Sequence, residues 1–266
     1  MTVPTRRRAL AAALLSASRL RDDAVLDDLP ATVRPADEDE AYAVQSVAHQ
    51  LLAHAGWGVQ VGWKIGCTTP VMQAYLGIAN PCAGAIFQAN VWRQQHWFPA
   101  ASRGRLGVEC EIAVRLGTEL RPHGTPVQVD DAADAVVACM AAIEVVEDRY
   151  VDYRSLEAPT LIADDFFHHS CVLGEERADV GPRTLIEARA EMTINGESMG
   201  YGSGADILGE PLRALAWLAN AAASWGTPLQ AGAIVLLGSL VQTQWVQSGD
   251  SVLVENTALG PVSARF

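Results

Sequence analysis

The sequence has no long apolar run, no cysteine pair at metal-binding spacing, and few basic residues. Its apolar stretches fall short of the roughly 20 residues that a membrane-spanning helix needs. The five cysteines are scattered and odd in number, and none are spaced C-x-x-C, which argues against a disulfide framework and a zinc site. We therefore expect free thiols, a cytoplasmic location and no membrane partner.

Acidic residues outnumber basic ones. The chain has 19 Lys and Arg against 31 Asp and Glu, a formal net charge of -12. Binding to nucleic acid phosphates needs clustered Lys and Arg, so we expect no nucleic-acid partner. An acidic protein that handles an anionic substrate must supply positive charge locally, and a bound metal ion is one way to do so.

The first 55 residues have the spacing of helices. Arg6–Arg8 before an Ala/Leu stretch resembles a signal peptide, but polar residues interrupt the stretch and its apolar positions recur at helical spacing. We expect an amphipathic helix there instead. The expected apolar stripes are Leu10, Leu14 and Leu15 in a first helix, and Ala41, Val44, Val47, Ala48 and Leu51 in a second.

An acidic segment, residues 22–39, separates these two helices. It contains Pro30 and Pro35, which favour a linker or extended loop. Asp37 is the expected N-terminal cap of the second helix. The sequence thus predicts a small helical lobe over residues 1–55.

From Gly56 onward, short segments rich in Val and Ile alternate with Gly and Pro, which is typical of strands. The expected strands are 59–65, 108–114, 142–146, 191–195, 234–237, 251–254 and 262–266. Helices are expected at 130–140 and 211–224. The fold class predicted is α+β, with one strand-dominated catalytic domain over residues 56–266.

Glu109 and Glu111 form the sharpest chemical pattern. Side chains alternate along a strand, so these carboxylates point the same way about 7 Å apart. Glu144 lies in a second apolar strand. Three converging carboxylates make a hard-oxygen site suited to Mg²⁺ or Mn²⁺. The alternative is that each Glu lies on the solvated side of its strand, as an isolated E-x-E pair usually does.

Several segments together resemble one family. Gly62-Trp-Lys-Ile-Gly66 with Leu76-Gly-Ile78 resembles the G-x-K-x-G and LGV segments of the 2-oxopent-4-enoate hydratases. These enzymes belong with the 4-oxalocrotonate decarboxylases to the fumarylacetoacetate hydrolase superfamily. Matching segments, in order, are Ala41–Gln45, Val108–Ala113, Ala142–Arg149, Gly202–Asn220, Gly238–Leu240 and Gly249–Asp250. The resemblance runs from about residue 40 to the C-terminus.

The resemblance implies a mixed, strongly curved β-structure with outer helices, and a homo-oligomer. It places the metal ligands on Glu109, Glu111 and Glu144 and the essential lysine on Lys64. It also implies that Ser239 and Leu240 bind substrate. The alternative for Lys64 is a side chain that extends to the surface.

Two departures from the family pattern affect the predicted pocket. Cys82 follows Pro81 where relatives carry an acidic residue, and a thiol replaces a carboxylate poorly at neutral pH. Phe167 and His168 stand where relatives carry small hydroxyl residues. We expect Cys82 and Phe167 to contact substrate, and Asp165 or His168 to move protons. The alternative for His168 is a surface pair with its neighbour His169.

The reaction implied is the addition of water to a 2-hydroxy-2,4-dienoate, giving a 4-hydroxy-2-oxo acid during the breakdown of aromatic or related rings. The substrate is expected to be a small 2-oxo or 2-enol acid. Decarboxylation of a 4-oxalocrotonate-like diacid is the nearest alternative. Hydrolysis of a C–C bond is a further one, although the chain lacks an early His–Glu pair for it. Cys82 keeps open a catalytically inactive, metal-binding partner subunit.

Overall fold

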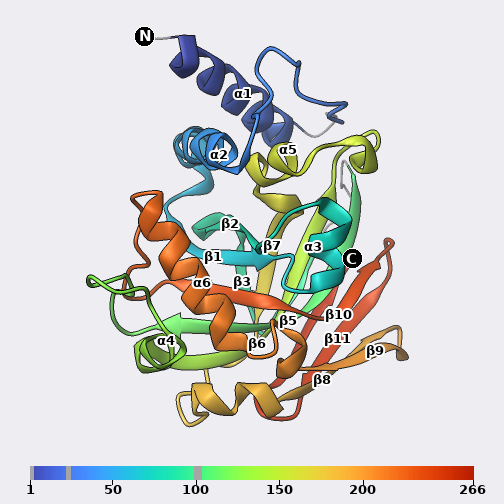
Figure 1. Ribbon diagram of the computed structural model, residues 1–266. Coiled ribbons are helices and arrows are strands. Elements are labelled where there is room, and N and C mark those ends of the chain that lie inside the picture. Colours follow the sequence, from blue (N-terminus) through green and yellow to red (C-terminus); the bar gives the residue numbers. More distant parts are fainter. Residues whose placement is uncertain (1–2, 22–24, 99–103) are drawn as a thin grey trace.

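Two β-sheets carry most of the chain in the computed structural model, which describes residues 3–21, 25–98 and 104–266 (Figure 1). The larger sheet has seven strands. In sheet order they are β2 (Cys82–Phe87), β1 (Gln60–Gly66), β10 (Ile234–Trp245), β5 (Arg105–Leu116), β6 (Val136–Asp148), β7 (His168–Leu173) and β3 (Val91–Arg93). The smaller sheet comprises β4 (Gln95–Trp97), β12 (Gly260–Arg265), β11 (Ser251–Asn256), β8 (Arg189–Ile194) and β9 (Glu197–Ser203).

Both sheets are mixed. β1 pairs with β10 in parallel, whereas β10, β5, β6 and β7 pair antiparallel. The pairing of β10 with β5 shifts register three times between Leu236 and Gln244. Such irregularities bend a strand and increase its twist. The predicted strands are all present, and the mixed, curled arrangement confirms the predicted α+β class.

Both faces of the larger sheet are buried. Val108, Cys110 and Ile112 face the main apolar core, whereas Ala113 and Met140 belong to a smaller apolar cluster. Because side chains alternate along β5, Glu109 and Glu111 share the face of Ala113. The two carboxylates therefore lie on the sheet face that carries the smaller apolar cluster. The predicted alternative of two glutamates on a solvated face is wrong.

Helices cover the sheets from outside. They are α3 (Pro70–Leu76), α4 (Val129–Ala135), α5 (Ala158–Ala163) and α6 (Pro211–Ser224), with short helical turns η1 (Ala53–Trp57), η2 (Gln88–Asn90), η3 (Tyr153–Ser155), η4 (Asp165–Phe167), η5 (Pro182–Glu187) and η6 (Gly204–Asp206). α6 has the bounds predicted. The predicted helix at 130–140 is wrong beyond Ala135, because β6 begins at Val136. The β-branched Val136 and Val137 favour a strand, and pairing with β5 outweighs the helical spacing of the alanines.

The N-terminal helices α1 (Val3–Leu20) and α2 (Glu38–Leu52) pack against each other, and α2 packs against α5 (Figure 1). Asp37 caps α2 as predicted, accepting a 2.8 Å hydrogen bond from the backbone N–H of Glu40. The division at residue 55 stays a prediction. No helix in the described ranges is long and apolar enough to cross a bilayer.

The predicted apolar stripes are partly wrong. Leu10 is 52% exposed and Leu51 is 40% exposed. In α1 the buried face instead follows Ala11, Leu15 and Arg19, at successive i, i+4 positions. This face includes a charged residue because Arg19 finds buried partners elsewhere in the fold. Of the predicted linker, residues 22–24 lie outside the described ranges, and Leu26 pairs with the backbone of Arg149 and Val151.

Two glycines on either side of Lys64 make room around it. A Cβ added at Gly62 would lie 2.1 Å from the carbonyl oxygen of Ile234 on β10. A Cβ at Gly66 would lie 3.0 Å from the ring of Phe166 and 3.5 Å from Nζ of Lys64. The G-x-K-x-G pattern therefore allows close contact between β1, β10 and the turn that contains Phe166.

Gly62→Ala should destabilise the protein by at least about 2 kcal/mol, because β1 and β10 must separate to admit the methyl group. Urea unfolding followed by circular dichroism measures this. Gly181→Ala is the matched control, since Gly181 has a φ of -67° and a Cβ there meets nothing closer than 4.0 Å. Equal unfolding midpoints for the two variants would contradict the expected crowding.

Candidate metal centre and substrate pocket

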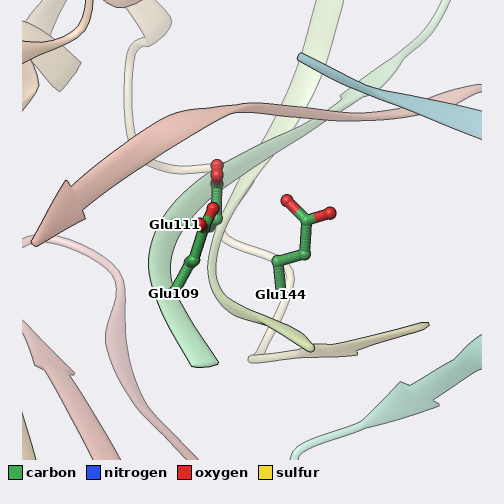
Figure 2. Close-up of side chains that lie close together, drawn as sticks. All are labelled: Glu109, Glu111 and Glu144. Carbon is green, nitrogen blue, oxygen red and sulfur yellow. The ribbon is translucent and has the colours of Figure 1, made fainter. Parts of the chain in front are cut away.

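The register of β5 and β6 brings the three predicted carboxylates together. Glu109 lies directly opposite Glu144 in the antiparallel pair, and Glu111 is two residues further along β5. One oxygen from each of the three lies within 4.8 Å of the others (Figure 2). Two come from one strand and one from its neighbour, so backbone pairing fixes their spacing.

Partners of the three carboxylates leave two oxygens unsatisfied. Glu111 Oε2 accepts a 2.7 Å hydrogen bond from the backbone N–H of Gly238, and Glu109 Oε1 accepts a 2.5 Å bond from Thr243 Oγ1. Within the described part of the chain, the buried Oε1 of Glu111 and Oε2 of Glu144 have no hydrogen-bond partner. Buried carboxylate oxygens without partners are costly, and a hard cation satisfies them. The donor set therefore fits Mg²⁺ or Mn²⁺.

The three carboxylates differ in how far neighbouring groups offset their negative charge. Burial, followed by repulsion from Glu144, raises the pKa of Glu109, and burial with both neighbouring carboxylates raises that of Glu111 well above its usual value. Burial would also raise the pKa of Glu144, but the charge of Lys64 and the hydrogen bond with His168 outweigh it and the net shift is downward. Glu144 is thus the carboxylate that the protein itself compensates.

Lys64 is buried beside the cluster. Its Nζ lies 3.2 Å from Glu144 Oε1, donates a 2.7 Å hydrogen bond to the carbonyl oxygen of Phe166, and lies 5.2 Å from the centre of that ring. Burial lowers the pKa of Lys64, but the charges of Glu144 and Glu109 more than offset this and raise it. With 2% of its surface exposed, Lys64 does not extend to the surface, so that alternative is wrong.

A cavity of about 480 Å³ opens beside Lys64 and Glu109. Its polar lining includes Thr68, Ser239, Gln242, Thr243 and Asp206, and its apolar lining includes Val71, Met72, Leu76, Tyr153, Phe166 and Phe167. Of the residues predicted to bind substrate, Ser239, Leu240 and Phe167 lie in its wall. A larger open hollow of about 740 Å³ lies on the smaller sheet and is lined by Arg189, Tyr201 and Glu255 among others. Its described residues form no such carboxylate cluster.

His168 reaches the cluster because β7 has a one-residue irregularity. Val145 pairs with Ser170 but Val146 pairs with His168, so His169 is the extra residue and His168 takes the face of Glu144. His168 Nδ1 lies 2.8 Å from Glu144 Oε1, and the ring is buried. The alternative of a surface pair is therefore wrong for His168. The side chain orients Glu144 and is not part of the cavity lining.

Asp165 and Cys82 are both buried away from the cavity lining. Asp165 Oδ1 accepts a 2.9 Å hydrogen bond from the backbone N–H of Ala85 and lies 2.7 Å from His49 Nε2. Burial raises the pKa of Asp165, but His49 and Arg19 outweigh this and lower it. Cys82 Sγ lies 3.7 Å from Cys67 Sγ, and burial and that thiol raise the pKa of Cys82. Cys82 therefore stays protonated and is no substitute for a carboxylate.

Sequence reasoning missed four contributors to the site: the Gly238 N–H, Thr243, Tyr153 and Met72. Gly238 lies in a segment that resembled the family, which could have directed attention to it. Thr243 lies three positions beyond that segment on a strand with shifted register, so no spacing rule places it opposite Glu109.

Known proteins resemble this chain over most of its length. Residues 82–266 match the fumarylacetoacetate (FAA) hydrolase C-terminal family. A 2-keto-4-pentenoate hydratase of Paraburkholderia phymatum is 35% identical over 254 residues, which is 94% of this chain and 95% of the relative. A 4-oxalocrotonate decarboxylase of a Pseudomonas species is 31% identical over 91% of this chain and 88% of the relative.

Among solved structures, the 4-oxalocrotonate decarboxylase from Pseudomonas putida G7, complexed with magnesium and adipate, superposes with a TM-score of 0.90. The match covers 100% of this chain and 98% of that chain at 24% identity. The predicted fold of the fumarylacetoacetate hydrolase type is thereby confirmed.

Glu111→Gln should weaken Mn²⁺ binding at least about 100-fold, because a neutral amide removes one anionic ligand. Isothermal titration calorimetry measures the affinity. In metal-free protein the same change should leave the urea midpoint unchanged or raise it, since it relieves a buried charge crowded by two others.

Glu255→Gln removes the same charge from β11 of the other sheet and is the control, for which wild-type Mn²⁺ affinity is expected. Unchanged affinity in Glu111→Gln would remove Glu111 from the metal site.

Proposed function

The chain belongs to the fumarylacetoacetate hydrolase superfamily, in its group of hydratases and decarboxylases, and on this premise we propose that it hydrates a 2-hydroxy-2,4-dienoate. The product is a 4-hydroxy-2-oxo acid. The hydratase relative that covers nearly the whole chain supports this assignment. The structure adds a reason to prefer it over decarboxylation of a diacid.

That reason is the charge of the cavity. Among the described side chains that line it, Lys64 is the one cation, and it already contacts Glu144 and the Phe166 carbonyl. The other charged lining residues, Glu109 and Asp206, are acidic. A second carboxylate at the far end of a diacid would lie against apolar walls or near Asp206, unpaired in either place. A mono-acid with an apolar tail has no such cost.

Glu109, Glu111 and Glu144 would hold Mg²⁺ or Mn²⁺. Bound there, the ion would supply a Lewis acid for the 2-oxo acid head of the substrate and its conjugated chain. His168 keeps Glu144 in position, as hydrogen-bonded partners of metal ligands commonly do. Thr243 and the Gly238 N–H do the same for Glu109 and Glu111.

Lys64 is the residue that would act on the substrate directly. An ammonium has three N–H donors, and contacts with Glu144 and Phe166 account for two of them. We assign the third to the enolate or carboxylate oxygen of the substrate, where the charge of Lys64 stabilises the negative charge that develops. The proton-transfer roles predicted for Asp165 and His168 stay predictions. Their contacts favour holding a turn and orienting Glu144.

A cytoplasmic location fits the five free thiols, and we propose it on that ground. Assembly into a homo-oligomer stays a prediction.

Metal-loaded protein should convert 2-hydroxypenta-2,4-dienoate to the 4-hydroxy-2-oxo acid, with kcat/KM at least about 100-fold above that for a 4-oxalocrotonate analogue, because the cavity offers no second cation. Loss of the conjugated absorbance gives the rates, and proton NMR identifies the products. Carbon dioxide release from the diacid, without hydration of the mono-acid, would establish the decarboxylase instead. Turnover of neither substrate by protein that still binds Mn²⁺ and oxalate would favour an inactive partner subunit.

Lys64→Met should lower kcat at least about 100-fold, because the developing charge loses its one cationic side chain. Mn²⁺ should still bind, since Lys64 is not a ligand. The combination separates loss of catalysis from loss of the metal. A kcat within about threefold of wild type would exclude Lys64 from the chemistry.

A further inference from the structure

Three consecutive residues that are not glycine adopt left-handed backbone conformations at the edge of the cavity. The φ angles of Asp165, Phe166 and Phe167 are 54°, 46° and 65°. Residues other than glycine rarely adopt the left-handed region even singly. Such conformations persist only where surrounding contacts impose them. We call residues 164–167 the strained turn. The rings of Phe166 and Phe167 line the cavity.

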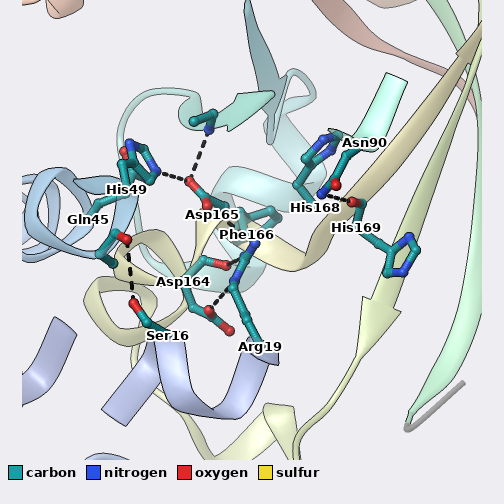
Figure 3. Close-up of polar contacts among 12 residues, drawn as sticks. Ser16, Arg19, Gln45, His49, Asn90, Asp164, Asp165, Phe166, His168 and His169 are labelled. Carbon is teal, nitrogen blue, oxygen red and sulfur yellow. Dashed lines mark hydrogen bonds and ion pairs between the residues drawn. The ribbon is translucent and has the colours of Figure 1, made fainter. Parts of the chain in front are cut away.

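Buried charges on the far side of the turn hold it in place (Figure 3). Arg19 of α1 donates from Nε to Asp164 Oδ1 at 2.7 Å and from Nη2 to the Asp164 carbonyl oxygen, and its Nη1 lies 3.4 Å from Asp165 Oδ2. The Asp164 carboxylate also binds Arg149 and accepts a 2.6 Å hydrogen bond from Tyr150. All of these side chains are buried.

Arg19 is distinctive because one guanidinium contacts both the backbone and the two carboxylates of the turn. Arg149 contacts the Asp164 carboxylate and Ser18 of α1. The planar, forked guanidinium of Arg19 fixes both the position and the orientation of Asp164 and Asp165. A helix that the sequence assigns to a separate lobe therefore reaches the turn beside the cavity.

On its other side, the turn presents a backbone carbonyl to Lys64. The Phe166 carbonyl oxygen accepts the 2.7 Å hydrogen bond from Nζ, and the Phe166 ring lies 5.2 Å from the same atom. These contacts and Glu144 together determine where the ammonium points. A shift of the turn moves the acceptor, and the ammonium follows it.

We propose that Arg19 is a positioning residue, which acts through the strained turn to hold the Lys64 ammonium toward the substrate oxygens. This inference rests on the proposed function, in which Lys64 contacts substrate. Misplacement of a reacting group by about 1 Å costs on the order of 100-fold in rate. Arg19→Met should therefore lower kcat about 10- to 100-fold and leave the Mn²⁺ dissociation constant within about threefold of wild type.

A role limited to anchoring α1 would give a different pattern. The distinguishing experiment is a double-mutant cycle of Arg19→Met and Lys64→Met, measured by calorimetry as affinity of Mn²⁺-loaded protein for the substrate analogue 2-oxopentanoate. If Arg19 acts through Lys64, each single change weakens binding about tenfold, and the double variant binds within about threefold of Lys64→Met alone. If the two residues act independently, their effects multiply.

Arg34→Met is the matched control. Arg34 lies in the same N-terminal region and pairs with Asp28, but it does not contact the strained turn. Its kcat and analogue affinity should equal those of wild type. Arg19→Lys keeps the positive charge but loses the forked guanidinium, so it should give an intermediate kcat. It also provides a folded variant for the test if Arg19→Met does not fold.

The proposal is overturned by wild-type kcat in Arg19→Met, by multiplicative effects in the cycle, or by failure of 2-oxopentanoate to bind the wild-type protein. Failure of the proposed function has a separate signature, namely no water addition by the wild type. The double-mutant cycle is measured as affinity for 2-oxopentanoate, so it does not depend on turnover.

Discussion

Clustering of three carboxylates on one face of one sheet, with Glu111 and Glu144 buried, is the constraint on which the rest of the structure depends. The cost of removing such charges from water has to be offset by nearby partners. The protein supplies those partners from strands on both sides of the β5–β6 pair: Lys64 on β1 and the Gly238 N–H and Thr243 on β10 on one side, and His168 on β7 on the other. The strand order β1-β10-β5-β6-β7 therefore assembles the site, because no single strand carries enough of it.

Irregular strand pairing places two of the hydrogen-bond partners of the carboxylates. In a regular β7, His169 would take the position opposite Val146, and the extra residue instead places His168 there. On β10, Gly238 has a φ of 137°, and its N–H reaches Glu111 where the pairing with β5 shifts. Each irregularity interrupts ladder hydrogen bonds locally but directs a donor at a buried carboxylate. Register shifts of this kind are features of the site and not defects of the sheet.

Sequence reasoning identified what depends on local pattern. Strand alternation predicted that Glu109 and Glu111 share a face, and the capping pattern predicted Asp37. It failed where tertiary contacts outweigh local preference, as in the helix expected beyond Ala135. It also missed the role of Arg19, since the polar partners of that residue are 145 positions away. Arg19 lies four positions after Leu15 of the predicted stripe, and this could have been taken as a sign of such a partner, because buried Arg is rarely unpaired.

The strained turn lies between two buried charge clusters and contacts both. On one side, Lys64 compensates the metal-binding carboxylates, and on the other, Arg19 and Arg149 compensate Asp164. The short segment between them, with its left-handed backbone, contacts both Arg19 and Lys64. Buried, forked ion pairs add geometric specificity as well as energy, so they fix the position and the orientation of the turn. In this arrangement α1 contributes to the site, because its arginine binds the turn whose backbone carbonyl accepts the hydrogen bond from Lys64.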